Sequence, residues 1–385
     1  MRYKMNIAII CDVLGEENNG TTIAAMTLIR YLKAQGHTVR IVCADQKKKG
    51  MEDVFVVPNL NLGKLLNRYI EKVGVSLAKA DKTILAEALN GVDHVHIMLP
   101  FSLGTAVIKM AKKFNLPTTA GFHMQAENFT SYLGLNWLQP LNRAVYKHIY
   151  RTLYKHVDAI HYPTQFIKDV FESHIKHSTR GYVISNGVHG YVQRRESEKP
   201  LFLQDKFVIL STGRYAREKA QDVLIKAVAL SKYKDKIQLI LGGQGHKEKY
   251  YKRLARNLPI QPIMQLYSRT EIIDVLNYAD MYVHPAEMEL EGISCLEAIV
   301  CGKLTIVSDS PLSATQQFAA SEKCIFRHGD PKSLALAIDY FIEHPEERRR
   351  HEQLYLEKSC RYEQDVCMQQ METMMKEVCN GKKNA

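Results

Sequence analysis

The sequence lacks paired cysteines and long hydrophobic runs. Its eight cysteines lie scattered at positions 11, 43, 295, 301, 324, 360, 367 and 379, and no two form a C-x-x-C pair. This spacing argues against a zinc site and a disulfide framework, and it favours a reducing cytosol. The apolar run in MRYKMNIAIICDVLG ends at Asp12, too early for a signal peptide or a membrane span, and no other segment could cross a bilayer.

The sequence also lacks an excess of acidic residues, and its excess of basic residues lies mainly in the first half. Residues 1–185 hold 23 lysines and arginines against 14 aspartates and glutamates, while residues 186–385 hold 29 against 27. A basic first half indicates an anionic surface as partner, although solubility alone could explain it. No nucleic-acid-binding motif accompanies the charge, so nucleic acid is not expected as a partner.

Strand–helix alternation runs through the whole chain, without short repeats or low-complexity tracts. MNIAIICDV, IAAMTLIRYLKAQG and HTVRIVCAD open one series, and KFVILSTGRY, AQDVLIKAVALSKYK and IQLILGGQG open a second. This order predicts an α/β protein of two Rossmann-like domains, at residues 1–185 and 201–360, with a linker at 186–200 and a helical segment at 361–385. Ligands of such sheets bind beyond the carboxyl ends of the strands.

Two strand exits in the second series carry residues that suit a diphosphate. STGRYAREK presents Arg214 and Lys219, whose charges could offset a phosphate leaving group. In LILGGQG, Gly243 would let the backbone approach a ligand closely. Each motif alone could equally be a solvated basic loop or an ordinary glycine turn.

The stretch EMELEGISCLEAIVCG predicts a helix that begins near Gly292 and ends before Gly302. Its first turn would offer four backbone amides to a phosphate, those of Ile293, Ser294, Cys295 and Leu296. Glu297, one turn in, could accept hydrogen bonds from vicinal hydroxyls, and Glu289 could approach another part of the same ligand. The alternative is that these acids only stabilise the helix terminus, which fits Glu291 better than Glu297.

The spacing E289-x7-E297, together with GRYAREK, SNGV and NNGTTIAAMTLIRYLKAQGHTV, resembles the retaining GT-B glycosyltransferases of family 4. The resemblance covers nearly the whole chain. It implies two domains facing each other across a cleft, a C-terminal helix that crosses back to the first domain, and a nucleotide-sugar donor. The implied donor contacts are Glu289 to the sugar hydroxyls, Glu297 to the ribose, Arg214 and Lys219 to the diphosphate, Tyr267 near the base and Gly20 facing the phosphates. The implied catalytic residues are Glu289 and, in the stretch AGFHMQAEN, His123. The family usually has Gly where this chain has Leu290.

The resemblance also implies the chemistry. An acceptor hydroxyl would attack the anomeric carbon with retention, and the diphosphate would leave on the same face. Arginine, lysine and helix amides would stabilise the leaving group, so no cofactor and no metal are expected. No His or Asp stands at ligand spacing beside the acidic residues.

The segment WLQPLNRAVYKHIYRTLYKHVDAIHY bears on the acceptor. It places Arg143, Lys147, Arg151 and Lys155 four residues apart among aromatic and aliphatic residues, a pattern typical of a helix that binds anionic lipid headgroups. Residues 63–80 form a weaker candidate of the same kind. An ordinary surface helix with its aromatics in the core is the alternative for both.

Within family 4, the chain resembles the bacterial 1,2-diacylglycerol 3-alpha-glucosyltransferases, on GFHMQAENFT, the basic segment and the acidic stretch. That branch tolerates a residue other than Gly at the position of Leu290, and it implies that Glu127 and Asn128 lie near acceptor or sugar. The prediction is transfer of glucose from UDP-glucose to a lipid hydroxyl, at the cytoplasmic face of the membrane. Alternatives are a family 4 enzyme with a saccharide or small-molecule acceptor, a GT-B nucleotide-sugar 2-epimerase, and a non-enzymatic membrane-binding or nucleic-acid-binding protein.

Overall fold

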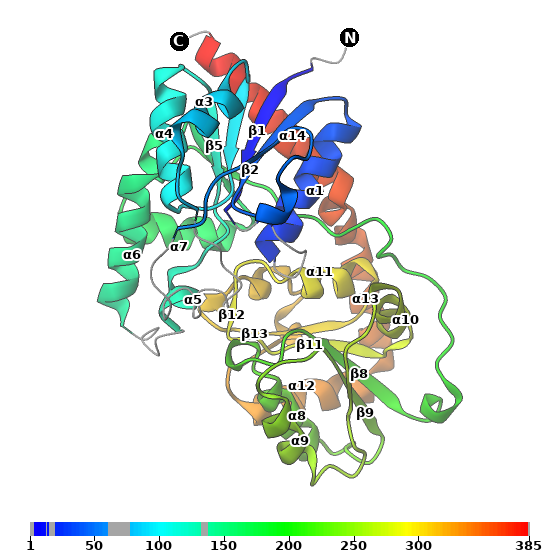
Figure 1. The fold of residues 1–385 in the computed structure, drawn as a ribbon. Coiled ribbons are helices and arrows are strands. Elements are labelled where there is room, and N and C mark those ends of the chain that lie inside the picture. The colour runs from blue at the N-terminus through cyan, green and yellow to red at the C-terminus, as the bar shows by residue number, and fades with distance from the viewer. Residues whose placement is uncertain (1–3, 13, 15–19, 61–77, 132–137, 384–385) are drawn as a thin grey trace. The chain divides into compact units, whose positions relative to one another are not determined.

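The chain divides into two compact units in the computed structural model (Figure 1). The first comprises Met1–Ser185 and Met368–Ala385, and the second comprises Asn186–Cys367. The structure describes residues 4–12, 14, 20–60, 78–131 and 138–383.

A parallel sheet forms the centre of the first unit, with strand order β3-β2-β1-β4-β5-β6-β7. The strands are β1 (Asn6–Ile10), β2 (Thr38–Cys43), β3 (Val54–Val56), β4 (His94–Ile97), β5 (Thr118–Gly121), β6 (Ala159–Tyr162) and β7 (Gly181–Val183). Ile7 stands opposite both Val39 and His94, which places β1 in the middle of the sheet. Because all strands run the same way, their carboxyl ends share one edge.

Helices connect these strands and cover the sheet. They are α1 (Gly20–Ala34), α3 (Lys82–Leu89), α4 (Ser102–Lys113), α5 (Ala126–Ser131), α6 (Gln139–Thr152) and α7 (Gln165–Ile175). The C-terminal helix α14 (Gln364–Lys383) begins in the second unit and packs on the first from Met368 onward. There the Nε2 atom of His37 lies 3.1 Å from the Oε1 atom of Glu372, and Lys382 forms an ion pair with Asp158 at 3.2 Å.

The second unit repeats the plan with strand order β10-β9-β8-β11-β13-β15. The strands are β8 (Phe207–Thr212), β9 (Ile237–Gly242), β10 (Ile263–Gln265), β11 (Met281–His284), β13 (Thr305–Ser308) and β15 (Ile325–Phe326), and a separate parallel pair joins β12 (Met288–Glu289) to β14 (Leu312–Ser313). Its helices are α8 (Gln221–Leu230), α9 (Glu248–Ala255), α10 (Arg269–Tyr278), α11 (Ile293–Val300), α12 (Pro331–Glu343) and α13 (Pro345–Ser359).

The prediction of two α/β units is confirmed by these two parallel sheets. Residues 186–200, expected to form a linker, count within the second unit. There the backbone N–H of Arg195 donates to Asn277 at 2.9 Å, and Lys199 pairs with Asp280 at 2.7 Å. No helix in the described part of the chain is both long enough and apolar enough to cross a membrane.

Candidate active site

The predicted donor residues of the second unit gather at the carboxyl edge of its sheet. Arg214 follows β8, Gly243 follows β9 and Tyr267 follows β10, while Glu289 lies in β12, just beyond β11. Neighbouring parallel strands end side by side, so loops that are distant in sequence become adjacent.

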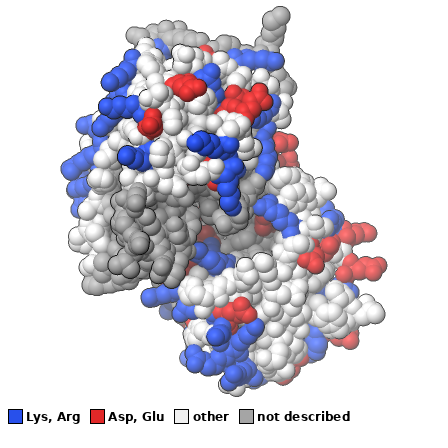
Figure 2. Space-filling view, in the orientation of Figure 1, with Lys and Arg blue, Asp and Glu red and all other residues white. Residues whose placement is uncertain are grey.

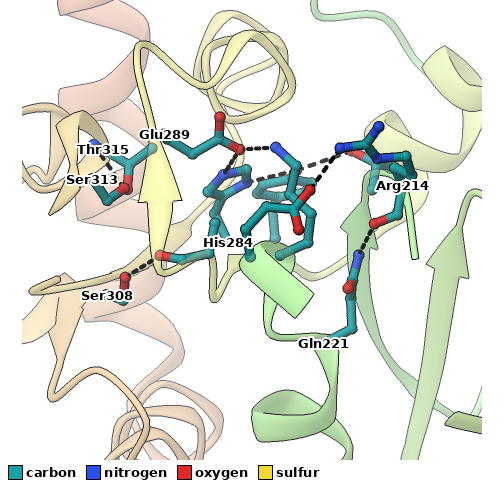
Figure 3. A network of polar contacts seen from close by, with 12 residues as sticks. Arg214, Gln221, His284, Glu289, Ser308, Ser313 and Thr315 are labelled. Atoms are coloured by element: carbon teal, nitrogen blue, oxygen red, sulfur yellow. Dashed lines mark hydrogen bonds and ion pairs between the residues drawn. The ribbon is translucent and has the colours of Figure 1, made fainter. Parts of the chain in front are cut away.

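Glu289 lies at the centre of a polar network (Figure 3). The Nζ atom of Lys219, which ends a single-turn 3-10 helix, donates to the Oε1 atom of Glu289, and the Nε2 atom of His284 lies 2.9 Å from the same oxygen. Burial would raise the pKa of Glu289, but the charge of Lys219 and the hydrogen bond from His284 outweigh it and lower the pKa to about 2. Glu289 is therefore an ionised, nearly buried carboxylate.

Arg214 sits beside this network but faces solvent. Its guanidinium donates to Glu218 at 2.7 Å, and its side chain is 59% exposed. The Nε2 atom of Gln221 donates to the backbone carbonyl of Arg214 at 3.2 Å (Figure 3). The Tyr251 hydroxyl donates in turn to Gln221 at 2.9 Å. These two hydrogen bonds thus hold the backbone of the loop, while the Arg214 side chain remains accessible.

The exits of β8 and β9 touch through their glycines. Gly243 has φ +155°, and a Cβ atom there would lie 2.1 Å from the carbonyl oxygen of Gly213. The backbone N–H of Gly243 donates to Gln265 at 2.8 Å, which ties β9 to β10 at the same level. Only glycine permits this approach, so Gly243 has a structural role whatever it binds.

Fewer backbone amides at the start of α11 are open to a ligand than expected. Gly292, with φ +85°, precedes the helix, and its carbonyl oxygen accepts from Cys295 at 2.9 Å and from Leu296 at 3.1 Å. The expectation that all four amides are open to a phosphate is therefore wrong for these two, which the helix itself uses. The N–H groups of Ile293 and Ser294 have no partner among the described residues.

Glu297 and Tyr267 have unusual environments. Among the described residues, the Glu297 carboxylate has neither a hydrogen bond nor an ion pair. Burial raises its pKa to about 7, with the charge of Arg269 acting in the opposite direction. Tyr267 is half-buried after β10, and burial raises its pKa to about 12. A carboxylate free to accept hydrogen bonds is what a ribose site requires.

Glu291, for which the alternative of stabilising the helix terminus fitted best, is bound to another segment of the chain. It is only 4% exposed, and its carboxylate accepts from the backbone N–H of Asn186 at 3.1 Å and from the Asn186 side chain at 2.5 Å. The acid before α11 therefore anchors the SNGV segment to the second unit.

In the first unit, His123 follows β5 and lies close to a second histidine. Its ring packs on Gly121, where a Cβ atom would lie 2.5 Å from the His123 Nε2 atom, and its centroid is 5.5 Å from that of His161. Burial and then His161 lower the pKa of His123 to about 3. Its Nε2 atom has no partner in the described part of the chain. Gly20 begins α1, and no described atom lies within 4 Å of a Cβ placed there.

The predicted acceptor residue Glu127 is turned into the protein. It is 1% exposed, and its carboxylate accepts from the Tyr146 hydroxyl at 2.7 Å, which joins α5 to α6. The backbone of Asn128 lies in α5, but its side chain is outside the described structure. Glu127 as found joins two helices, and its burial leaves almost none of its surface open to an acceptor.

The four cations of the basic segment do not share one helix. Arg143, Lys147 and Arg151 lie on α6, whereas Lys155 lies in the 3-10 turn Tyr154–His156 that follows. The helix ends at Thr152 because the backbone of Leu153 leaves the helical conformation, with φ −128° and ψ −66°.

Two aromatics of this segment face the core, as the alternative interpretation expected, while Tyr150 is half-buried. Tyr146 and Tyr154 are buried and pack around Phe122. Figure 2 shows lysine and arginine side chains along the edge of the first unit where α4 and α6 lie. Membrane contact by α6 must therefore rest on its cations. The second basic candidate, residues 63–80, falls mostly outside the described residues.

His284 was missed by the sequence-based reasoning. It ends the buried strand β11, so its sequence context indicates a core position. In the structure it contacts the carboxylate of Glu289, five residues further along the chain. The signal available was a polar residue at a strand exit directly before the acidic loop. Among the described residues, no group of three or more His, Cys, Asp and Glu side chains is arranged to hold a metal ion.

Comparison with known families covers both units. Residues 18–189 match the model of Glycosyltransferase Family 4, and residues 192–353 match that of Glycosyl transferases group 1. The chain belongs to this family of GT-B glycosyltransferases.

Individual relatives are more distant. The alpha-monoglucosyldiacylglycerol synthase of Streptococcus pneumoniae is 24% identical over 324 residues, which cover 80% of this chain and 72% of that protein. A sucrose-phosphate synthase from Thermosynechococcus elongatus, 16% identical, matches 98% of this chain and 100% of its own with a TM-score of 0.75. The catalytic domain of cholesterol-alpha-glucosyltransferase from Helicobacter pylori is 43% identical over 40% of this chain and 98% of its own, with a TM-score of 0.40.

Proposed function

We propose that this glycosyltransferase moves glucose from UDP-glucose to a lipid hydroxyl, with diacylglycerol as the acceptor, at an anionic membrane surface. The observation that carries the proposal is the pairing of Lys219 with Glu289 at the edge of the second sheet. One cation and one carboxylate in contact can separate to meet a diphosphate and a sugar hydroxyl, both of which a nucleotide sugar carries.

The other groups of the second unit fit the rest of the donor. The open amides of Ile293 and Ser294 and the accessible Arg214 suit phosphate oxygens. Glu297 has a carboxylate available for ribose hydroxyls, and Tyr267 offers an aromatic face to a base. In the proposed reaction the acceptor oxygen bonds to the anomeric carbon while the bond from that carbon to the β-phosphate oxygen breaks. The hydroxyl proton passes to the departing phosphate.

A lipid acceptor is supported by two separate features. One is the similarity to the alpha-monoglucosyldiacylglycerol synthase of Streptococcus pneumoniae, which is 24% identical. The other is the cationic surface formed by the end of α6 and the turn after it, where Arg151 and Lys155 are exposed. Because the aromatics there are buried, we propose that attachment is electrostatic, with each cation contributing about 1 kcal/mol near an anionic surface.

A donor and acceptor panel tests the proposal. Purified protein is given labelled UDP-glucose, UDP-galactose, UDP-N-acetylglucosamine or GDP-mannose with diacylglycerol micelles, with and without phosphatidylglycerol. We expect a lipid-extractable glucoside from UDP-glucose, formed faster with the anionic lipid. No lipid-extractable product under any condition would remove the lipid acceptor, and conversion of UDP-N-acetylglucosamine without acceptor would indicate an epimerase.

Charge reversal tests the membrane surface. Arg151→Glu with Lys155→Glu should lower binding to vesicles containing phosphatidylglycerol by about 10-fold or more, because reversing these two charges changes the local net charge by about four units. Lys249→Glu with Lys252→Glu, on α9 of the second unit, reverses the same charge elsewhere and is the control. Equal losses in a sedimentation assay would mean that total charge matters and α6 does not.

The same glycosyltransferase acting on a soluble acceptor is the second candidate. It is favoured by the burial of Tyr146 and Tyr154, which leaves α6 with less apolar surface than an inserting helix needs. Activity on saccharides that is independent of vesicles would support it.

A further inference from the structure

His284 is held at both ring nitrogens. Its side chain is 2% exposed at the end of β11, with Nε2 2.9 Å from the Oε1 atom of Glu289. Its Nδ1 atom lies 3.3 Å from the Tyr282 hydroxyl, and that hydroxyl lies 3.0 Å from Thr212 on the neighbouring strand β8. Figure 3 shows the ring between these two contacts, directed at the carboxylate.

The chemistry of the partners determines the direction of these hydrogen bonds. An ionised carboxylate only accepts, so Nε2 of His284 carries the hydrogen that points to Glu289. With a neutral ring, Nδ1 accepts from Tyr282, whose own oxygen can accept from Thr212. The result is a directed chain from β8 through β11 to Glu289, and it holds the ring in one orientation.

Lys219 and His284 share the same oxygen of Glu289. Both contacts go to Oε1, and Oε2 has no hydrogen bond among the described residues. A sugar hydroxyl can therefore reach Oε2 without displacing His284. A diphosphate that attracts Lys219, by contrast, removes one of the two groups that keep the buried carboxylate charged.

We propose that His284 is the positioning residue for Glu289, which keeps the carboxylate ionised and aimed at the donor sugar once Lys219 has turned to the diphosphate. The inference rests on the proposed function. Without the His284 donor, a buried carboxylate that has lost its lysine would take up a proton or turn to solvent. Either change makes Glu289 a poor acceptor for a sugar hydroxyl.

Two substitutions of His284 separate positioning from packing. His284→Met fills similar space but has no donor, whereas the amide of His284→Gln can still donate to Glu289. We expect His284→Met to lower kcat/KM for UDP-glucose by about 10- to 100-fold, the usual effect of one charged hydrogen bond. His284→Gln should recover most of that loss. Affinity for UDP, which has no sugar to meet Glu289, should change less than about threefold in both variants.

His328→Met is the matched control. His328 also contacts a carboxylate, Asp309 at 3.0 Å, but both side chains are exposed, at 48% and 39%. Activity and calorimetric affinities for UDP and UDP-glucose are measured for all proteins, with melting temperatures to identify unfolding.

Three results would overturn the inference. They are His284→Met within about threefold of wild type, equal losses in the Met and Gln variants, and UDP affinity falling as much as UDP-glucose affinity. Wild-type protein that transfers no sugar would instead overturn the proposed function, and the inference with it.

Discussion

Glu289→Gln should have opposite effects on UDP and on UDP-glucose. Lys219 and Glu289 neutralise each other in the structure, with side chains 22% and 12% exposed. A diphosphate that binds Lys219 must break this pair. UDP gives Glu289 nothing in return, whereas UDP-glucose supplies sugar hydroxyls as new partners.

The size of the effect follows from the carboxylate's environment. A fall in the pKa of Glu289 from 4.5 to about 2 corresponds to about 3 kcal/mol of net stabilisation of its charge. Lys219 and His284 share this amount, which leaves about 1–2 kcal/mol to the lysine. Without the carboxylate, Lys219 is available at no such cost, so UDP should bind about 5- to 30-fold more tightly. UDP-glucose gains the same amount but loses the charged hydrogen bonds from its sugar hydroxyls, about 1.5–3 kcal/mol each. With two such bonds lost, it should bind more weakly, by about 10-fold.

Isothermal titration calorimetry of both ligands against wild type and Glu289→Gln measures this crossover. Glu287→Gln is the control, because it removes a charge two residues away that has no ion pair with Lys219 among the described residues. Weaker binding of UDP to Glu289→Gln would refute the reasoning. It would mean that Glu289 holds Lys219 in place for the phosphates rather than competing for it.

Two further substitutions test the site and its scaffold. Burial raises the pKa of Glu297 from 4.5 to about 7, so folding loses stability as pH rises between these values. Glu297→Gln should therefore gain about 1–3 kcal/mol over wild type at pH 8 but little at pH 5, while binding UDP more weakly, and equal gains at both pH values in thermal unfolding would contradict this. Gly243→Ala places a Cβ atom 2.1 Å from the Gly213 carbonyl and should lower the free energy of unfolding by about 2–4 kcal/mol in urea. Gly190→Ala, whose Cβ meets nothing described within 4 Å, should change it little, and similar values for both would contradict the steric argument.

The fold was predictable because each strand and helix carries its own hydrophobic period. The stretch KFVILSTGRY contains β8, and GISCLEAIVCG contains α11, within a few residues of the bounds in the structure. Strand exits then led to Lys219 and Glu289, because parallel strands bring their ends together. Their direct contact was not predictable, since it depends on how two loops meet.

The errors in the sequence-based predictions arose where tertiary packing overrides the local sequence pattern. The four-residue spacing of cations predicted a single helix through Lys155, but the backbone leaves the helical conformation at the buried residue Leu153, so α6 ends at Thr152. The pattern also could not tell which side of α6 faces the core. His284 was overlooked for the opposite reason, because in the run MYVH it looks like one more buried strand residue.

The acids of residues 287–297 cannot be assigned by charge, because each has a different partner. Glu289 is shared by Lys219 and His284, Glu291 is bound to Asn186, and Glu297 has no polar partner among the described residues. Their pKa directions follow these partners, lowered for Glu289 and raised for Glu297, although burial acts in the same sense on both. A ligand that supplies hydroxyls and phosphates together would meet two different acids. The charge of Glu289 is already balanced by Lys219, whereas the charge of Glu297 is still disfavoured by burial. Glu289 must exchange Lys219 for the ligand, so its contact should depend on the competition for Lys219. Glu297 only gains a partner, so its contact should depend on pH near 7.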